Sequence, residues 1–308
     1  MIPRLIPHRV FPPMLGLALV MLPFAAGCSS GGSADGGAAN GKIDAVAGEN
    51  FYGDLVAKVA GDLVSVTSIL SDPNVDPHTY ETSFQNAQQV ADATLVVENG
   101  LGYDAFLDHL IGASPRSDRK VVDVQQLLGL ADGVNPHIWY DPTTMPKVAR
   151  AVADALEQLA PASKSAVEAN LATYLDSFAP LTAKIAEMKA RFPGAAVAYT
   201  EPVPGYLLAA LGFQVLTPAG FARAIENGTD PAPADVAAQQ DLLTGHKVKV
   251  LLYNSQATSP VTETIKSLAG QSGVPVVGVS ETMPAGVGFV AWQLSQLNAM
   301  ESALGGSR

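Results

Sequence analysis

Short apolar runs of β type alternate with helical stretches between residues 42 and 124. Strands that alternate with helices are typical of parallel βαβ units. In this part of the chain we predict strands over residues 42–48, 63–70, 94–97 and 120–124, and helices over residues 51–60, 83–91 and 103–110.

The pattern changes between residues 143 and 191, where no strand is predicted. Pro161 fits the first turn of a helix, whereas Pro180 falls inside a helical pattern and predicts a kink. Apolar residues recur there at intervals of three or four, which is the spacing of one helix face. They are Val167, Leu171, Tyr174, Phe178, Leu181, Ile185 and Met188.

Strands and helices alternate again beyond residue 194. We predict strands over residues 195–199, 215–216, 247–253 and 274–279, and helices over residues 206–211, 234–243, 262–271 and 289–304. The whole pattern predicts an α/β protein with two Rossmann-like βα lobes, each built on a parallel sheet, bridged by a long α-helix. The predicted lobes cover residues 42–142 and 194–308, and the connecting helices cover residues 143–193.

Residues 1–27 are typical of a secretory signal peptide. Arg4 and Arg9 precede an apolar run that ends in small residues before Cys28. Prolines interrupt this run, so it is a poor candidate for a membrane-spanning helix. The Ala-Ala-Gly-Cys ending resembles a bacterial lipobox, which implies a lipid on Cys28; an ordinary signal peptide with an incidental cysteine is the alternative. Residues 28–41 are rich in Gly, Ser and Ala, and we expect a flexible tether.

The composition narrows the class of protein. Hydrophobic residues make up 48% of the 308 residues and charged residues 15%, with a single cysteine, which excludes a disordered chain and a disulfide scaffold. The net charge is −11, and it becomes −13 when residues 1–27 are removed, because they hold two arginines and no acidic residue. An acidic surface repels phosphate backbones, so we expect no nucleic-acid partner.

Four positions carry chemistry typical of metal ligands. His78 and His137 each follow a proline, which stiffens the loop before the imidazole. Glu201 and Glu281 each follow the end of a predicted strand, where open α/β sheets gather ligand-binding groups. Two imidazoles and two carboxylates would formally neutralise a divalent cation. A surface histidine in a turn and a solvated or capping glutamate are the alternatives at each position, and Glu81 could bind or orient His78 or start a helix.

The chain from residue 42 onward resembles the zinc/manganese solute-binding proteins of ABC uptake transporters, the ZnuA/TroA-like family, of the cluster A-I type. The matching stretches include Asp76-Pro77-His78 and Asn135-Pro136-His137. The full set covers residues 51–62, 76–81, 91–100, 135–142, 253–256 and 278–282. The resemblance implies that the metal ligands are His78, His137, Glu201 and Glu281, with the metal in the cleft between the two lobes.

The resemblance also implies the biological role. We expect a non-enzymatic, monomeric binding protein, lipid-anchored through Cys28 on the outer face of the bacterial cell membrane, that delivers Zn²⁺ or Mn²⁺ to an ABC-transporter permease. Two carboxylate ligands favour Mn²⁺ slightly, whereas the general affinity order favours Zn²⁺. A secreted metallohydrolase and a metal-binding adhesin or scaffold lipoprotein are the alternatives. A catalytic zinc site usually keeps an open position for water, and four protein ligands leave none.

Overall fold

The computed structural model describes residues 41–74 and 76–306. The predicted signal peptide, most of the tether and Cys28 lie outside the described residues. Among the described helices, none has both the length and the apolar character needed to cross a membrane.

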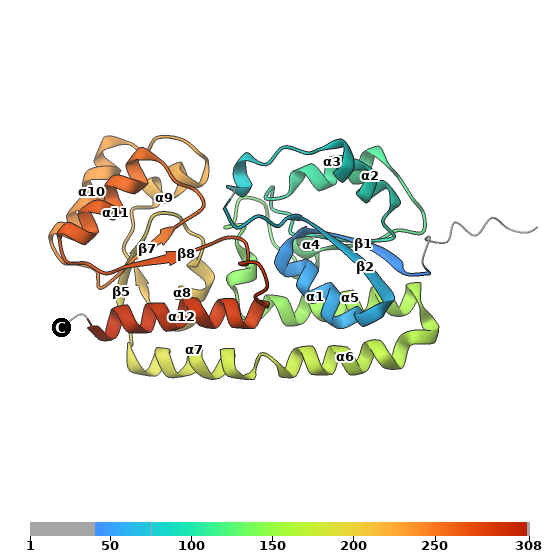
Figure 1. The fold of residues 1–308 in the computed structure, drawn as a ribbon. Helices are drawn as coiled ribbons and strands as arrows, with labels where there is room; N and C mark the ends of the chain where they lie inside the picture. Colours follow the sequence, from blue (N-terminus) through green and yellow to red (C-terminus); the bar gives the residue numbers. More distant parts are fainter. Residues whose placement is uncertain (1–40, 75, 307–308) are drawn as a thin grey trace, which may run out of the picture. The chain divides into compact units, whose positions relative to one another are not determined.

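The first sheet has the strand order β2-β1-β3-β4, and all of its strands are parallel. Its strands are β1 (Ile43–Glu49), β2 (Val64–Leu70), β3 (Leu95–Glu98) and β4 (Lys120–Asp123). Helices α2 (Phe84–Asp92) and α3 (Ala105–Ala113) cover one face of this sheet (Figure 1). The other face is covered by α1 (Asn50–Ala60) and α5 (Thr144–Leu159). The short helix α4 (Val124–Leu128) lies beside α5.

The second sheet repeats this arrangement. Its order is β6-β5-β7-β8, again all parallel. Its strands are β5 (Ala196–Tyr199), β6 (Gln214–Val215), β7 (Leu251–Asn254) and β8 (Val276–Val279). Helices α9 (Ala219–Glu226), α10 (Pro233–Thr244) and α11 (Pro260–Gln271) lie on one side, and α8 (Gly205–Leu211) and α12 (Phe289–Gly306) lie on the other. The predicted α/β class with two parallel-sheet lobes is therefore confirmed.

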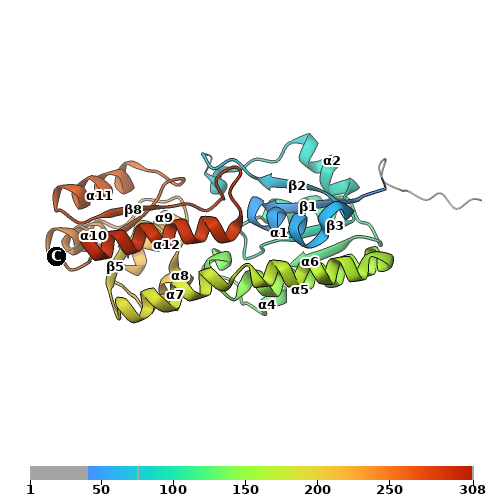
Figure 2. The same cartoon turned by 60° about the horizontal axis from the view of Figure 1, so that its bottom comes forward.

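The connection between the lobes is helical but not continuous. Two residues separate helix α6 (Lys164–Asp176) from α7 (Ala179–Arg191), and both helices run along the same side of the two sheets (Figure 2). Pro180 lies in the first turn of α7, where its missing N–H costs no helical hydrogen bond. The predicted kink is thus a break at residues 177–178, placed before the proline instead of at it.

One continuous core lies beneath both sheets. It joins α1, α5 and α6 of the first half to α7, α8 and α12 of the second. A separate cluster packs between each sheet and the helices on its opposite face. The lobes therefore share buried apolar surface in addition to a covalent connection. Burial of such surface is the main driving force of folding, so this core holds the two sheets together.

Candidate metal centre

The structure brings the four predicted side chains together. One ligand atom from each of His78, His137, Glu201 and Glu281 lies within 4.8 Å of the others. Nε2 of His78 is 3.1 Å from Oε1 of Glu201 and 3.3 Å from Oε2 of Glu281. Nε2 of His137 is also 3.3 Å from Oε2 of Glu281. The two histidines come from the first lobe and the two glutamates from the second, so the cluster spans the lobes.

A capped turn positions His78. The residue lies in a short 3-10 turn, Pro77–Thr79, in the long loop that follows β2. The Asp76 carboxylate accepts a hydrogen bond from the backbone N–H of His78 at 2.9 Å, and Pro77 occupies the first position of the turn. The side chain of His78 remains 26% exposed, whereas those of its three partners are fully buried. His78 is therefore the ligand-type residue closest to solvent.

A single amide fixes the orientation of His137. Oδ1 of Asn135 lies 2.7 Å from Nδ1 of His137 and also accepts the backbone N–H of His137 at 3.0 Å. Nδ2 of Asn135 donates to the carbonyl of Pro202 at 2.7 Å, which fixes the amide orientation. Nδ1 of His137 then donates to Asn135, and Nε2 faces the carboxylate of Glu281. Aromatic rings of Tyr103 and Trp139 pack edge-on against this imidazole.

The strand ends place the two glutamates. Glu201 follows β5 by two residues and Glu281 follows β8 by two residues, so both stand at the carboxyl edge of the second sheet. Both are buried, at 1% and 0% exposure. Buried carboxylates are stable only when they are paired or hydrogen-bonded, and the imidazoles provide that pairing.

The cluster is electrostatically coupled. Burial opposes the charged imidazolium of His78, but hydrogen bonds and charge attraction from Glu201 and Glu281 outweigh it and raise the pKa of His78 to about 11. For His137, burial acts in the same opposing sense, and the hydrogen bond to Glu281 still raises its pKa. Burial tends to raise the pKa of Glu281, but its hydrogen bonds to the two histidines hold it well below the ordinary value. A cation in the cluster would take the place of these protons.

Sequence patterns did not indicate two further polar groups beside the cluster. The hydroxyl of Tyr103 donates to Oε2 of Glu281 at 2.7 Å. Oε2 of Glu226, at the end of α9, lies 3.8 Å from Nδ1 of His137. Burial raises the pKa of Glu226, and the nearby positive charge of His137 works against that rise. Tyr103 follows the end of β3, a position that could have identified it, whereas α9 was not predicted and Glu226 gave no signal.

The other candidate groups lie apart from the cluster. His109 and His246 are exposed, and His246 has the positive backbone angle φ of 49° that is typical of a turn. Glu81 is exposed and is not one of the clustered residues. His8 lies outside the described residues.

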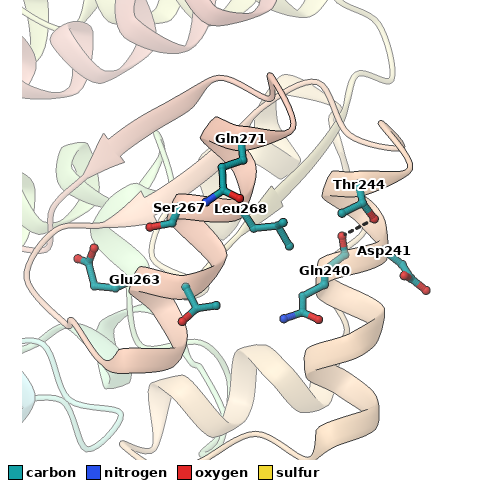
Figure 3. Close-up of a pocket in the computed structure, with 8 residues that line it drawn as sticks. Gln240, Asp241, Thr244, Glu263, Ser267, Leu268 and Gln271 are labelled. Carbon is teal, nitrogen blue, oxygen red and sulfur yellow. Dashed lines mark hydrogen bonds between the residues drawn. The ribbon is translucent and has the colours of Figure 1, made fainter.

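A cavity of about 760 Å³ opens beside the cluster and is lined by His78, Tyr103, Asn135 and Glu226, among others. A second hollow, of about 540 Å³, lies between α10 and α11 (Figure 3). Its lining includes Asp241 and Glu263 but no histidine or cysteine. Of these two cavities in the described part of the chain, the first has both an imidazole and a carboxylate in its lining, those of His78 and Glu226.

Comparison with known proteins matches this arrangement to a family. The family model "Zinc-uptake complex component A periplasmic", ZnuA, matches residues 46–303. The chain belongs to this family. The resemblance inferred from the sequence motifs is thereby confirmed. The ZnuA family is named for metal uptake and not for catalysis, which favours the transport interpretation over a metallohydrolase.

Relatives of this ZnuA-family chain are named for manganese as well as for zinc. Manganese-binding lipoprotein MntA of Halalkalibacterium halodurans is 30% identical over 171 residues, which cover 53% of this chain and 55% of the relative. The match thus spans about half the length of that curated relative. High-affinity zinc uptake system protein ZnuA of Bacillus subtilis is 23% identical over 277 residues, which cover 81% of this chain and 82% of the relative.

Solved structures share the fold of this ZnuA-family chain. The periplasmic zinc-binding protein TroA of Treponema pallidum superposes with a TM-score of 0.74 at 21% identity and covers 86% of this chain and 99% of its own. The solute-binding protein FpvC of Pseudomonas aeruginosa, solved with Mn²⁺, superposes with a TM-score of 0.71 at 23% identity over 87% of this chain and 100% of its own. At these identities the comparison establishes the architecture of two parallel-sheet lobes.

Proposed function

We propose that this protein is the extracytoplasmic solute-binding component of an ABC importer for a divalent transition metal. In this proposal, His78, His137, Glu201 and Glu281 bind one Zn²⁺ or Mn²⁺ ion as cargo. The protein then delivers the ion to a membrane permease. The observation that carries the proposal is the convergence of four ligand-type atoms within 4.8 Å, from both lobes.

The chemistry of these side chains supports transport of a transition metal. Two neutral imidazoles and two carboxylates supply four ligands and two negative charges. This ligand set suits Zn²⁺ and Mn²⁺ better than Ca²⁺ or Mg²⁺, because the latter two ions prefer sites made only of oxygen ligands. Three of the four side chains are buried, so a bound ion would be largely withdrawn from water. His78 would be the last ligand to close on the ion and the first to release it.

The shared core favours a small closing motion. The side-chain amide of Asn50, in the first half, donates to the carbonyl of Met283 at 2.9 Å and accepts from its N–H at 3.0 Å. The hydroxyl of Tyr140 donates to the carbonyl of Ser280 at 2.6 Å. Together with the continuous core, these links oppose a wide hinge motion, so we infer that capture rearranges the loop of His78 more than it rotates the lobes.

The anchor and the partner complete the proposal. We infer that Cys28 carries a lipid and that residues 28–41 tether the protein, a monomer, to the outer face of the cell membrane. A permease in that membrane then receives the ion. Mass spectrometry of the protein from membranes tests the anchor, since lipidation adds diacylglycerol mass to Cys28 and Cys28→Ser abolishes it.

Metal titration tests the central claim. We expect the purified, metal-stripped protein to bind one equivalent of Zn²⁺ or Mn²⁺, measured by calorimetry, and to unfold at higher temperature once loaded. Ligand at about 1,000 times its Kd would stabilise the fold by about 4 kcal/mol. Glu281→Ala should weaken binding at least a hundredfold, whereas Glu81→Ala, at an exposed acid three residues after His78, should not change it. Absence of binding by the parent protein would overturn the proposal.

A further inference from the structure

The amide of Asn254 connects the two carboxylates of the proposed metal site. Asn254 is the last residue of β7, between the strands that lead to Glu201 and Glu281, and it is 1% exposed. Its Nδ2 donates one hydrogen to Oε2 of Glu201 and the other to Oε1 of Glu281, the latter at 2.7 Å. One side-chain NH₂ group thus bridges both acids.

The direction of this amide is determined by its surroundings. Oδ1 of Asn254 accepts the backbone N–H of Gln256 at 3.0 Å. A reversed amide would turn its carbonyl oxygen toward two carboxylate oxygens and its NH₂ toward another N–H, and both contacts would be repulsive. The backbone N–H of Asn254 donates to Oγ1 of Thr200 at 3.0 Å, which fixes the strand end that carries the amide.

In each glutamate, one carboxylate oxygen binds Asn254 and the other faces an imidazole. On Glu201, Oε2 is bound to Asn254 and Oε1 lies 3.1 Å from Nε2 of His78. On Glu281, Oε1 is bound to Asn254 and Oε2 lies 3.3 Å from Nε2 of His137. Each glutamate therefore turns only one oxygen toward the imidazoles, which is the arrangement of a monodentate ligand.

The same turn also holds the backbone of the Glu281 loop. Oε1 of Gln256 accepts the N–H of Glu281 at 2.6 Å and that of Thr282 at 3.0 Å. Nε2 of Gln256 donates to Oγ1 of Thr282 at 2.8 Å. Gln256 thus fixes the backbone of Glu281, and Asn254 fixes its Oε1 atom. Glu281 cannot turn both carboxylate oxygens toward a metal ion without breaking these buried hydrogen bonds. Leaving such buried groups unpaired is unfavourable.

We propose that Asn254 is a specificity-determining residue that restricts Glu201 and Glu281 to one metal-binding oxygen each and thereby selects Zn²⁺ over Mn²⁺. This inference rests on the proposed function. With each glutamate monodentate, the site offers two nitrogens and two oxygens, the four-ligand set that Zn²⁺ takes in tetrahedral sites. Mn²⁺ favours oxygen-rich, octahedral surroundings, and bidentate carboxylates would supply the additional oxygens. The preference is opposite to the slight preference for Mn²⁺ that ligand type alone suggested.

A pair of variants separates this role from general support of the loop. Asn254→Ala frees the two carboxylate oxygens that Asn254 binds, Oε2 of Glu201 and Oε1 of Glu281. Gln256→Ala loosens the backbone of the Glu281 loop and leaves the hydrogen bonds of the Asn254 amide in place. Competition calorimetry with Zn²⁺ and Mn²⁺ on the full protein gives the ratio of the two Kd values. We expect Asn254→Ala to reduce the preference for Zn²⁺ at least tenfold. Gln256→Ala should weaken both metals by similar factors. An unchanged ratio in Asn254→Ala that still binds metal would overturn the inference and leave the proposed function intact.

X-ray absorption on the parent protein provides a test that does not depend on the folding of a variant. We expect bound Zn²⁺ to show four nitrogen and oxygen neighbours, and bound Mn²⁺ to show no bidentate carboxylate, with water completing its shell. Two bidentate carboxylates on either metal would overturn the role of Asn254. Failure of the parent protein to bind either metal would instead overturn the proposed function itself.

Discussion

Glu98 is a buried acid that ends β3 and is not one of the four clustered ligand-type residues. It is 6% exposed and stands opposite Asp123 in the register of β3 and β4. Burial and the negative charges of Asp104 and its neighbours raise the pKa of Glu98 to about 8. The folded protein therefore retains a proton on Glu98 at a pH where the unfolded chain has lost it.

The sign of the resulting pH dependence follows from this difference. Because the folded state binds more protons, the contribution of Glu98 is present below its unfolded pKa, near 4.5, and is lost as the pH rises toward 8. We expect the metal-free protein to lose about 1–2 kcal/mol of unfolding free energy through this group between pH 5 and pH 8, with allowance for partial solvent access. Urea unfolding of Glu98→Gln should show a flatter pH profile than the parent. A parallel profile would contradict the assignment, and Glu81→Gln, at an exposed acid, is the control.

At the scale of single residues, the sequence predicted the groups that carry an obvious chemical signature. His78 and His137 follow prolines, and Glu201 and Glu281 follow strands, so local context made them candidates, and the family resemblance selected them as the set of ligands. Asn254 stood within a motif but carried no predicted role. Its importance comes from the distance between two strand ends that only the folded sheet brings together.

Helix α11 illustrates what local sequence determines at the scale of an element. Oγ of Ser259 accepts the backbone N–H of Thr262 at 3.2 Å, and Oγ1 of Thr262 accepts the N–H of Ser259 at 2.8 Å. This reciprocal capping box satisfies two N–H groups that the first turn of a helix leaves without partners. Pro260 follows at the first helical position, where its ring fits the helix backbone.

Removal of the cap should destabilise the protein measurably. We expect Ser259→Ala to reduce the free energy of unfolding by about 1 kcal/mol, as measured by urea denaturation. Ser267→Ala, an exposed serine in the same helix, is the matched control and should be neutral or slightly stabilising, because alanine has the higher helix propensity. Equal effects of the two changes would show that the cap does not contribute.

Helix α9 and the place of the break between α6 and α7 were not predicted, for physical reasons. Helix α9 has only eight residues and buries only Phe221 and Ala222, so it offers no extended apolar stripe. Without α9 there was no reason to place Glu226 near His137. The break at residues 177–178 was predicted as a kink at Pro180, because proline can either interrupt a helix or begin one, and tertiary packing determines which.

At the scale of the whole molecule, the continuous core should make the two lobes unfold together. Phe51, at the start of α1, is fully buried, and its ring centroid lies 4.6 Å from that of Trp139 and 6.1 Å from that of Trp292 in α12. The aromatic contacts thus pass from the first half of the chain to its last described helix. Differential scanning calorimetry of the metal-free protein should give one transition whose van't Hoff and calorimetric enthalpies agree.

Phe51→Ala tests this coupling. We expect it to lower the free energy of unfolding by about 3–5 kcal/mol while the transition remains single, because the cavity lies in a core that both lobes share. A variant that melts in two steps, with the second step unshifted, would show that the lobes are independent units.

Helix α12 has a consequence for how the protein is made. It supplies Phe289 and Trp292, whose rings contact those of Phe178, Tyr140 and Phe51. Ribosomes add about 5–20 residues per second, so about 7–30 s separate the synthesis of the first lobe from that of α12. The shared core cannot close during that interval. For a chain that we propose is exported through a membrane, this order is favourable, because the predicted signal peptide precedes every segment of the shared core and the core stays incomplete until α12 is made.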